Sequence, residues 1–157
     1  DVNLADSNTQ TPLGIAAYGG RVEAVEKLVA AGADKSAQTQ YGTALQIAKM
    51  YVKDQVTLAK LVKLLSDTST LHGAAEAGDT DAMARLIEAK CDVNEQDTHG
   101  ATPVYIATCN GHVEAIEALV NARCDVNLAL NNTMTPLAVA ASQGHVEAVK
   151  KLVAAGA

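Results

Sequence analysis

Residues 92–124 read DVNEQDTHGATPVYIATCNGHVEAIEALVNARC, and much of this stretch returns 33 positions later. The triplet that begins at Asp92 recurs at Asp125, and the pentapeptide GHVEA begins at Gly111 and again at Gly144. A fixed period of this length is typical of a solenoid, in which each short repeat contacts only its neighbours. The sequence therefore predicts a stack of similar units.

Each repeat carries signals for two short helices. A Thr-Pro pair starts the first helix at Thr11, Thr102 and Thr135, where the hydroxyl caps a backbone amide and proline needs no N–H. Small pairs that let first helices approach closely follow at Ala74-Ala75, Ala107-Thr108 and Ala140-Ala141. A glycine that tolerates the left-handed conformation ends this helix at Gly20, Gly78, Gly111 or Gly144. Apolar residues at helical spacing predict the second helix, for example Val113, Ile116, Leu119 and Val120.

These phrases resemble the ankyrin repeat, whose first helix typically begins Thr-Pro-Leu-His-x-Ala. Residues 11–16 read TPLGIA and lack the histidine, whereas residues 69–74 read STLHGA and lack the proline. The resemblance covers the whole chain and implies an all-α fold, an ankyrin-repeat solenoid of about five helix-turn-helix units with short β-hairpin fingers. We expect a single array over residues 1–157, with repeats at about 5–33, 34–66, 67–94, 95–127 and 128–157. Interior-type residues in the last repeat, such as Leu152, lead us to expect a segment of a longer array or multidomain protein.

Composition argues against several function classes. The formal charge of −6 disfavours nucleic-acid binding, which usually needs a basic face. No apolar run approaches the roughly 18 residues of a membrane span, and no signal peptide opens the chain. We therefore expect an intracellular, cytoplasmic protein that does not insert into a membrane. The only aromatic residues are four tyrosines, which suits a stack filled by Ala, Leu, Val and Ile.

Four departures from the repeat concern backbone conformation. Lys90 and Arg123 stand where Gly32 and Gly156 end other helices, so we expect bulky side chains at left-handed positions. This conformation costs roughly 1–2 kcal/mol per residue, partly offset by a cation near a helix C-terminus. Two finger glycines are replaced by threonine, and asparagines, the next best residues for positive φ, stand just before them. Thr9 replaces one of these glycines and follows Asn8, and Thr133 replaces the other and follows Asn131 and Asn132.

The second repeat departs most from the pattern. The step from Leu13 to Leu45 is 32 residues, so its finger has lost one residue, and the step from Leu45 to Leu71 is only 26. We expect a helix from about Val52 to Leu65 and no hairpin between Leu65 and Leu71. Tyr51, in place of a small residue, indicates local repacking.

The sequence contains no recognisable reactive centre. Cys91 and Cys124 are one repeat apart, roughly the 8–10 Å of packed helices, which exceeds the reach of about 7 Å for a disulfide. We expect them to be buried thiols of a reducing compartment. His112 and His145 are likewise too far apart to share a zinc ion and should satisfy backbone groups at the second-helix start. We expect no catalytic residue, no metal and no cofactor, so the chain is not expected to be an enzyme.

Two asparagines have two possible roles. Leu86 with Asn94, and Leu119 with Asn127, resemble the pattern that asparaginyl hydroxylases modify in ankyrin repeats. The alternative is structural, with the two side chains bracing the turns of the fingers.

The resemblance implies a non-catalytic scaffold or adaptor that binds another protein, with no small-molecule substrate. Recognition would use the concave face made of finger tips and exposed first-helix positions. By position these residues are Ser7, Asn8, Gln10, Tyr18, Gln40, Tyr41, Met50, Gln96, Thr98, His99, Ala101, Asn110, Asn131, Asn132, Met134 and Gln143. Two alternatives stay open: an architectural subunit of a large assembly or of the cytosolic stack of a channel, and a regulatory module attached to an enzyme.

Overall fold

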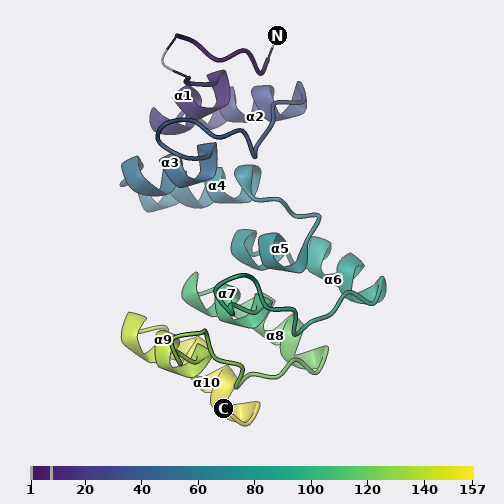
Figure 1. Cartoon of the computed structure of the whole chain (residues 1–157). Helices are drawn as coiled ribbons and strands as arrows, with labels where there is room; N and C mark the ends of the chain where they lie inside the picture. Colours follow the sequence, from purple (N-terminus) through teal and green to yellow (C-terminus); the bar gives the residue numbers. More distant parts are fainter. Residues whose placement is uncertain (1, 8) are drawn as a thin grey trace. The chain divides into compact units, whose positions relative to one another are not determined.

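The computed structural model describes residues 2–7 and 9–157, and within them it contains ten α-helices and no strand. The chain divides into two compact units, one ending at Asp67 and the other beginning at Thr68. The first unit contains α1 (Pro12–Tyr18), α2 (Val22–Ala30), α3 (Ala44–Tyr51) and α4 (Gln55–Leu65). The second contains α5 (Leu71–Ala77), α6 (Thr80–Glu88), α7 (Pro103–Cys109), α8 (Val113–Asn121), α9 (Pro136–Gln143) and α10 (Val146–Ala154). This is the predicted helical repeat solenoid (Figure 1).

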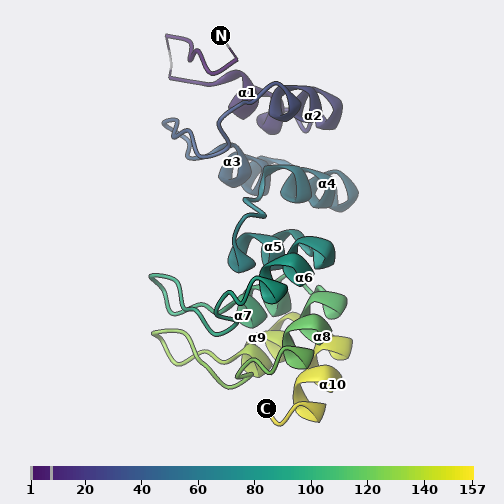
Figure 2. The same cartoon turned by 90° about the vertical axis from the view of Figure 1, so that its right-hand side faces the viewer.

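Within each unit the helices form two layers. In the first unit α1 packs against α3, and α2 packs against α4. In the second unit α5, α7 and α9 form one layer, while α6, α8 and α10 form the other. We call the odd-numbered helices the first helices and the even-numbered ones the second helices. The loops that lead into α7 and α9 project beyond their helices as fingers (Figure 2).

The predicted Thr caps start the first helices. The hydroxyls of Thr11, Thr102 and Thr135 each accept a hydrogen bond from a backbone N–H three residues on. Thr43 and Thr70 do the same without a following proline. Since such a cap contributes on the order of 1 kcal/mol, five short helices gain a defined start from one residue type.

Each unit has its own hydrophobic core. In the first unit Leu13, Val25 and Leu61 are fully enclosed. In the second unit the largest enclosed side chains are Met83, Val104, Ile116, Leu119 and Leu152. The small pairs lie between the first helices as predicted, except that Ala141 lies at the surface.

Among the described residues, four that are not glycine adopt left-handed backbone. Lys90 and Arg123 have φ of 61° and 63°, which confirms that prediction. In the fingers the threonines themselves take this conformation, with φ of 62° at Thr9 and 69° at Thr133. Asn132 has no positive φ, so an asparagine does not take over the role of the missing glycine in that finger.

The fingers are tight turns rather than strand hairpins. In the fourth repeat the N–H of Asp97 donates to the Ala101 carbonyl, and the N–H of Gly100 donates back to Asp97. Two other fingers repeat this pair of bonds, between residues 6, 9 and 10 and between residues 130, 133 and 134. Among the described residues the only β-bridge joins Thr39 and Gly42. The expected β-hairpins are thus reduced to turns held by two hydrogen bonds.

The second repeat confirms its predicted deletions and corrects one boundary. Its finger closes between Thr39 and Gly42, one residue less than in the others. Residues 66–70 form a turn and bends without a bridge, so no hairpin precedes Leu71. Helix α4 begins at Gln55, three residues later than predicted, because Val52 has extended backbone and Asp54 caps the helix through the Thr57 N–H.

Candidate binding surface

We define the finger face of each unit as its finger tips together with the exposed ends of its first helices. Most of the predicted binding residues lie there in the open. The exposed ones are Ser7, Tyr18, Gln40, Tyr41, Met50, Gln96, Thr98, His99, Asn110, Asn131, Asn132, Met134 and Gln143. Gln10 is half-buried, and Asn8 lies outside the described residues.

Ala101 is a wrong prediction, because it is buried with 7% of its surface exposed. Its N–H donates to Asp97 Oδ1 at 2.9 Å, and its carbonyl accepts from both Asp97 and the His72 ring nitrogen at 3.0 Å. Ala101 therefore belongs to the base of the finger. Its place next to the tip in the sequence gave no sign of this, since the finger turns back just before it.

The fingers of the fourth and fifth repeats are hydrogen-bonded to each other. The N–H of Asn131 donates to the His99 carbonyl at 3.0 Å, and its side-chain amide donates to the Thr98 carbonyl at 3.2 Å. The Gln96 amide donates to the carbonyls of Gly100 and Ala129. Gln96 and Asn131 thus hold the fingers together, which leaves neighbours such as His99 and Met134 better placed to meet a partner.

Asp97 organises the fourth finger from its base. Partial burial disfavours the charged carboxylate, but the backbone N–H groups of Ala101 and His99 donate to it and outweigh this effect. As a result the pKa of Asp97 lies below the ordinary value. The carboxylate is held in its charged form as a structural part of the finger.

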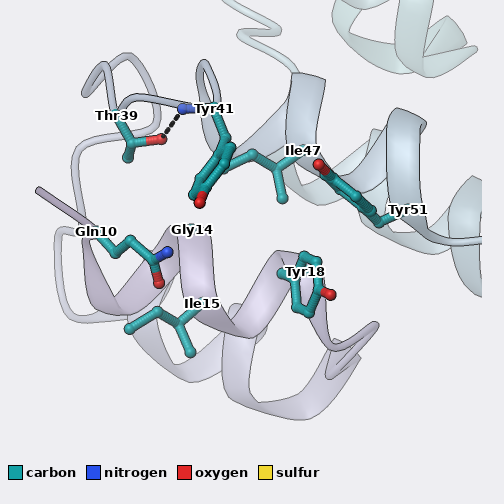
Figure 3. A pocket seen from close by; sticks show the side chains of 8 residues that line it. All are labelled: Gln10, Gly14, Ile15, Tyr18, Thr39, Tyr41, Ile47 and Tyr51. Atoms are coloured by element: carbon teal, nitrogen blue, oxygen red, sulfur yellow. Dashed lines mark hydrogen bonds between the residues drawn. The ribbon is translucent and has the colours of Figure 1, made fainter. Parts of the chain in front are cut away.

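The first unit has a pocket of about 350 Å³ on its finger face (Figure 3). Helix α1, helix α3 and the second finger form its walls. Its lining residues are Gln10, Gly14, Ile15, Tyr18, Thr39, Tyr41, Ile47 and Tyr51. The structure thus brings together three predicted residues, Gln10, Tyr18 and Tyr41, whereas the exposed Met50 does not line the pocket.

Ile15 and Tyr51 are lining residues that the sequence analysis missed. Ile15 is 48% exposed, and Tyr51 is 45% exposed with its ring centroid 4.8 Å from that of Tyr18. The sequence indicated only local repacking at Tyr51, although this residue occupies the helix-end position that Asn110 and Gln143 occupy in later repeats. That equivalence was the available signal for its exposure.

Similarity to known proteins agrees with this architecture. A family model described as ankyrin repeats, in three copies, matches residues 71–157, and a single ankyrin repeat model matches residues 8–40. The chain belongs to the ankyrin repeat family. It is also 30% identical over 115 residues to an L-asparaginase from Dirofilaria immitis, which covers 68% of this chain. The matched part spans 20% of the length of that relative.

The two repeat histidines of this ankyrin array link neighbouring repeats. The Nε2 of His112 lies 3.1 Å from the Glu76 carbonyl, and that of His145 lies 3.4 Å from the Cys109 carbonyl. Both rings satisfy backbone groups, as predicted, but the carbonyls belong to the preceding repeat. His145 also contacts the Gln143 side chain at 3.1 Å, so Gln143 has a structural partner.

Asn94 and Asn127 brace consecutive repeats. The Asn94 side chain accepts a hydrogen bond from the Asp125 N–H at 2.7 Å, and the Asn127 amide donates to the Gly156 carbonyl at 3.2 Å. Asn3 accepts from the Asp34 N–H in the same way, at 2.8 Å. The Asn94 and Asn127 side chains thus have a structural role, but they join one repeat to the next instead of bracing the finger turns as that alternative supposed.

The prediction that two cysteines are buried is wrong. Cys91 is exposed and Cys124 is half-buried, and both lie in the loop that follows a second helix. Among the described residues no disulfide joins any of the three cysteines. Burial, together with the nearby charge of Asp125, raises the pKa of Cys124 to about 11, so this thiol is a poor nucleophile at neutral pH.

The described part of the chain offers neither a cluster of metal ligands nor a membrane-spanning helix. Residues 2–7 and 9–157 contain no group of three or more His, Cys, Asp or Glu side chains that could hold a metal ion. Nor does any helix in those ranges have the length and apolar character needed to cross a bilayer.

Proposed function

We propose that this chain is a protein-binding module that engages its partner through the finger face. The observation that carries the proposal is the exposure of aromatic residues there. Three of the four tyrosines, Tyr18, Tyr41 and Tyr51, are 60%, 46% and 45% exposed around one pocket. Tyrosine in such places commonly contributes a large share of interface energy.

Family membership supports the same reading. Ankyrin repeats are generally protein-protein interaction modules and are typically non-catalytic. The fourth tyrosine, Tyr105, is half-buried beside Cys109, and burial raises its pKa to about 12. Tyr105 therefore serves the packing of the second unit, in contrast to the three tyrosines of the finger face.

The partner should be largely uncharged where it meets the fingers. The exposed tip residues are neutral and polar, such as Gln40 and Asn132, or apolar, such as Met134. We further propose that the encounter takes place inside the cell, since ankyrin repeat proteins are typically intracellular. Fractionation of source cells with an antibody against the chain tests that location.

A triple substitution tests the binding face. Tyr41→Ala, His99→Ala and Met134→Ala together should abolish capture of the partner by the immobilised chain and leave the helical circular dichroism signal intact. Each of these side chains is exposed, so the core does not depend on it. A loss of about 1–2 kcal/mol or more of binding free energy per residue is enough to abolish capture.

Charge reversal on a second helix is the matched control. Lys60→Glu with Lys63→Glu changes exposed residues of α4, away from the finger face, and should leave capture unchanged. A partner that tolerates the triple substitution but is lost with the lysine reversals would contradict the proposal. That result would favour an architectural subunit in which the second helices make the contacts.

The second candidate function is a regulatory module attached to an enzyme. The similarity to part of an L-asparaginase favours it, because this chain matches only a fifth of that longer protein. In this reading the repeats bind or position a catalytic domain and perform no chemistry of their own. Sequencing the complete transcript tests it: a catalytic domain on the same chain supports the idea, and a transcript that encodes repeats alone contradicts it.

A further inference from the structure

The pocket of the first unit is uncharged, and three of its lining residues are tyrosines. Its eight lining residues carry no formally charged side chain. Tyr18 and Tyr51 meet with an interplanar angle of 57° and form one side, while Tyr41 faces the pocket from the second finger (Figure 3). Ile15 and Ile47 supply the aliphatic part of the lining. Such a site offers ring faces and edges but no counter-ion.

The finger backbone that carries Tyr41 is held by hydrogen bonds before any partner arrives. The N–H of Tyr41 donates to the Thr39 hydroxyl at 3.1 Å, and that hydroxyl donates to the Gly42 carbonyl at 2.9 Å. The shortened finger therefore closes directly beneath the tyrosine. Backbone held in this way needs no further ordering when a partner binds, which lowers the entropic cost of the interface.

Gly14 keeps the inner part of the pocket open. A Cβ atom at this position would lie 3.3 Å from Thr11 Oγ1, 3.5 Å from Ile47 Cδ1 and 3.6 Å from Thr39 Cγ2, so it would take up space beside these side chains. Three residues after its capping threonine the third repeat also has a glycine, Gly73, whereas the fourth has Tyr105 and the fifth Ala138. The three surrounding tyrosines, rather than the glycine, therefore distinguish the first unit.

Charge and size limit what the pocket accepts. An anion finds no cation among the lining residues, and a cation finds ring faces but no carboxylate to offset the loss of its water shell. An apolar cavity of roughly 150 Å³ already holds benzene. The 350 Å³ here fits one large side chain together with the adjoining backbone of a partner.

We propose that this pocket receives one large, uncharged apolar side chain of the partner protein, of the leucine, methionine or phenylalanine class. The proposal rests on the proposed protein-binding function and specifies what the partner must present. The Gln10 amide, which is turned toward the pocket in Figure 3, is placed to pair with the partner's backbone beside that side chain. Specificity would then come from the absence of charge as much as from the rings.

Titration of the full 157-residue chain with blocked amino acids tests this by NMR. The probes are the N-acetyl methylamides of leucine, phenylalanine, trimethyl-lysine and aspartate. Leucine and phenylalanine should shift the signals of Tyr18, Tyr41 and Tyr51 and the methyls of Ile15 and Ile47 in a saturable way. The two charged probes should cause no saturable change. Tighter binding of trimethyl-lysine, or no saturable binding of leucine and phenylalanine, would overturn the proposal.

Variants show whether the tyrosines carry the effect. Tyr18→Ala with Tyr41→Ala should weaken binding of the phenylalanine probe about tenfold or more, whereas the two Phe substitutions should retain it because the rings stay. Val56→Ala, at an exposed apolar residue of α4, is the control and should change nothing. Equal affinity of wild type and the Ala double variant would contradict the assignment.

A second pair of substitutions distinguishes a failure of the pocket proposal from a failure of the proposed protein-binding function. His99→Ala with Met134→Ala alters only the second unit's finger face. If these two substitutions abolish partner capture while the wild-type pocket binds neither the leucine nor the phenylalanine probe, the protein-binding function is supported. The proposal of an apolar side chain in the pocket is then contradicted.

Discussion

At the scale of single residues, the left-handed backbone at Lys90 and Arg123 is a local cost within a stable repeat. Both follow the end of a second helix, where Gly32 and Gly156 occupy the same place with φ of 83° and 96°. The side chains are exposed, so packing does not explain their conformation. Their charge near a helix C-terminus offsets part of the cost.

Replacing these two residues with glycine should stabilise the fold. Lys90→Gly and Arg123→Gly should each raise the free energy of unfolding by up to about 1 kcal/mol, since relieved strain exceeds the added entropy of the unfolded chain. Urea denaturation measures the change. The reverse substitution Gly32→Lys, at a site with no atom within 4 Å of a new Cβ, should destabilise by a similar amount. Unchanged or lowered midpoints in both glycine variants would contradict the strain argument.

The lowered pKa of Asp97 gives a pH dependence with a definite sign. Because its carboxylate is favoured in the folded state, it contributes stability above the unfolded pKa of about 3.8, and this is lost as pH falls through the folded pKa. Wild type should therefore exceed Asp97→Asn in stability at neutral pH, and the difference should shrink in acid. Parallel urea titrations at several pH values measure it, and a difference that grows in acid would refute the assignment.

At the scale of elements, the contact between a histidine and a glycine of the preceding repeat joins successive repeats. A Cβ at Gly78 would lie 2.9 Å from the His112 ring, and one at Gly111 would lie 3.1 Å from the His145 ring. The glycine thus serves two purposes, since it ends the first helix and admits the imidazole of the next repeat. Only the first purpose is visible in the sequence, because helix ends follow from local patterns and ring placement follows from stacking.

A matched pair of glycines separates these two purposes. Gly78 and Gly144 both cap a first helix with left-handed backbone, at φ of 65° and 73°, but only Gly78 faces a histidine. Gly144→Ala should cost roughly 1–2 kcal/mol from the backbone alone. Gly78→Ala should cost more, because its Cβ also displaces the His112 ring.

Thermal unfolding of both variants measures the difference. Adding His112→Ala to Gly78→Ala removes the clash, so the cost of the glycine substitution in that background should fall to the level seen at Gly144. An equal loss of stability in Gly78→Ala and Gly144→Ala would show that the histidine contact does not contribute to stability.

Helices and caps were predictable because their signals are local. Thr caps, the replaced glycines and the shortened second finger follow from one-dimensional spacing, and the structure confirms each of them. The turn-like fingers and the late start of α4 were not predictable in this way. The form of the fingers depends on how many backbone hydrogen bonds a short loop makes. The start of α4 depends on Asp54, and not Val52, being the residue that caps the helix.

At the scale of the whole molecule, most of the candidate surface was predictable and its most distinctive part was not. Repeat position alone identified Tyr18 and Tyr41 as exposed. Position could not show that Ile15, Tyr51 and Gly14 complete a pocket with them, since this needs the side-by-side packing of α1 and α3. The buried Ala101 shows the opposite error, where a tip position in the sequence became part of the finger base.

The central claim, that the finger face is the working surface, is tested most directly by photo-crosslinking in source cells. A benzophenone amino acid would replace Tyr41 in one variant and the exposed Lys60 of α4 in another, each in the full-length chain. The account predicts a covalent adduct with the partner from position 41 and none from position 60. An adduct from position 60 with none from position 41 would contradict it.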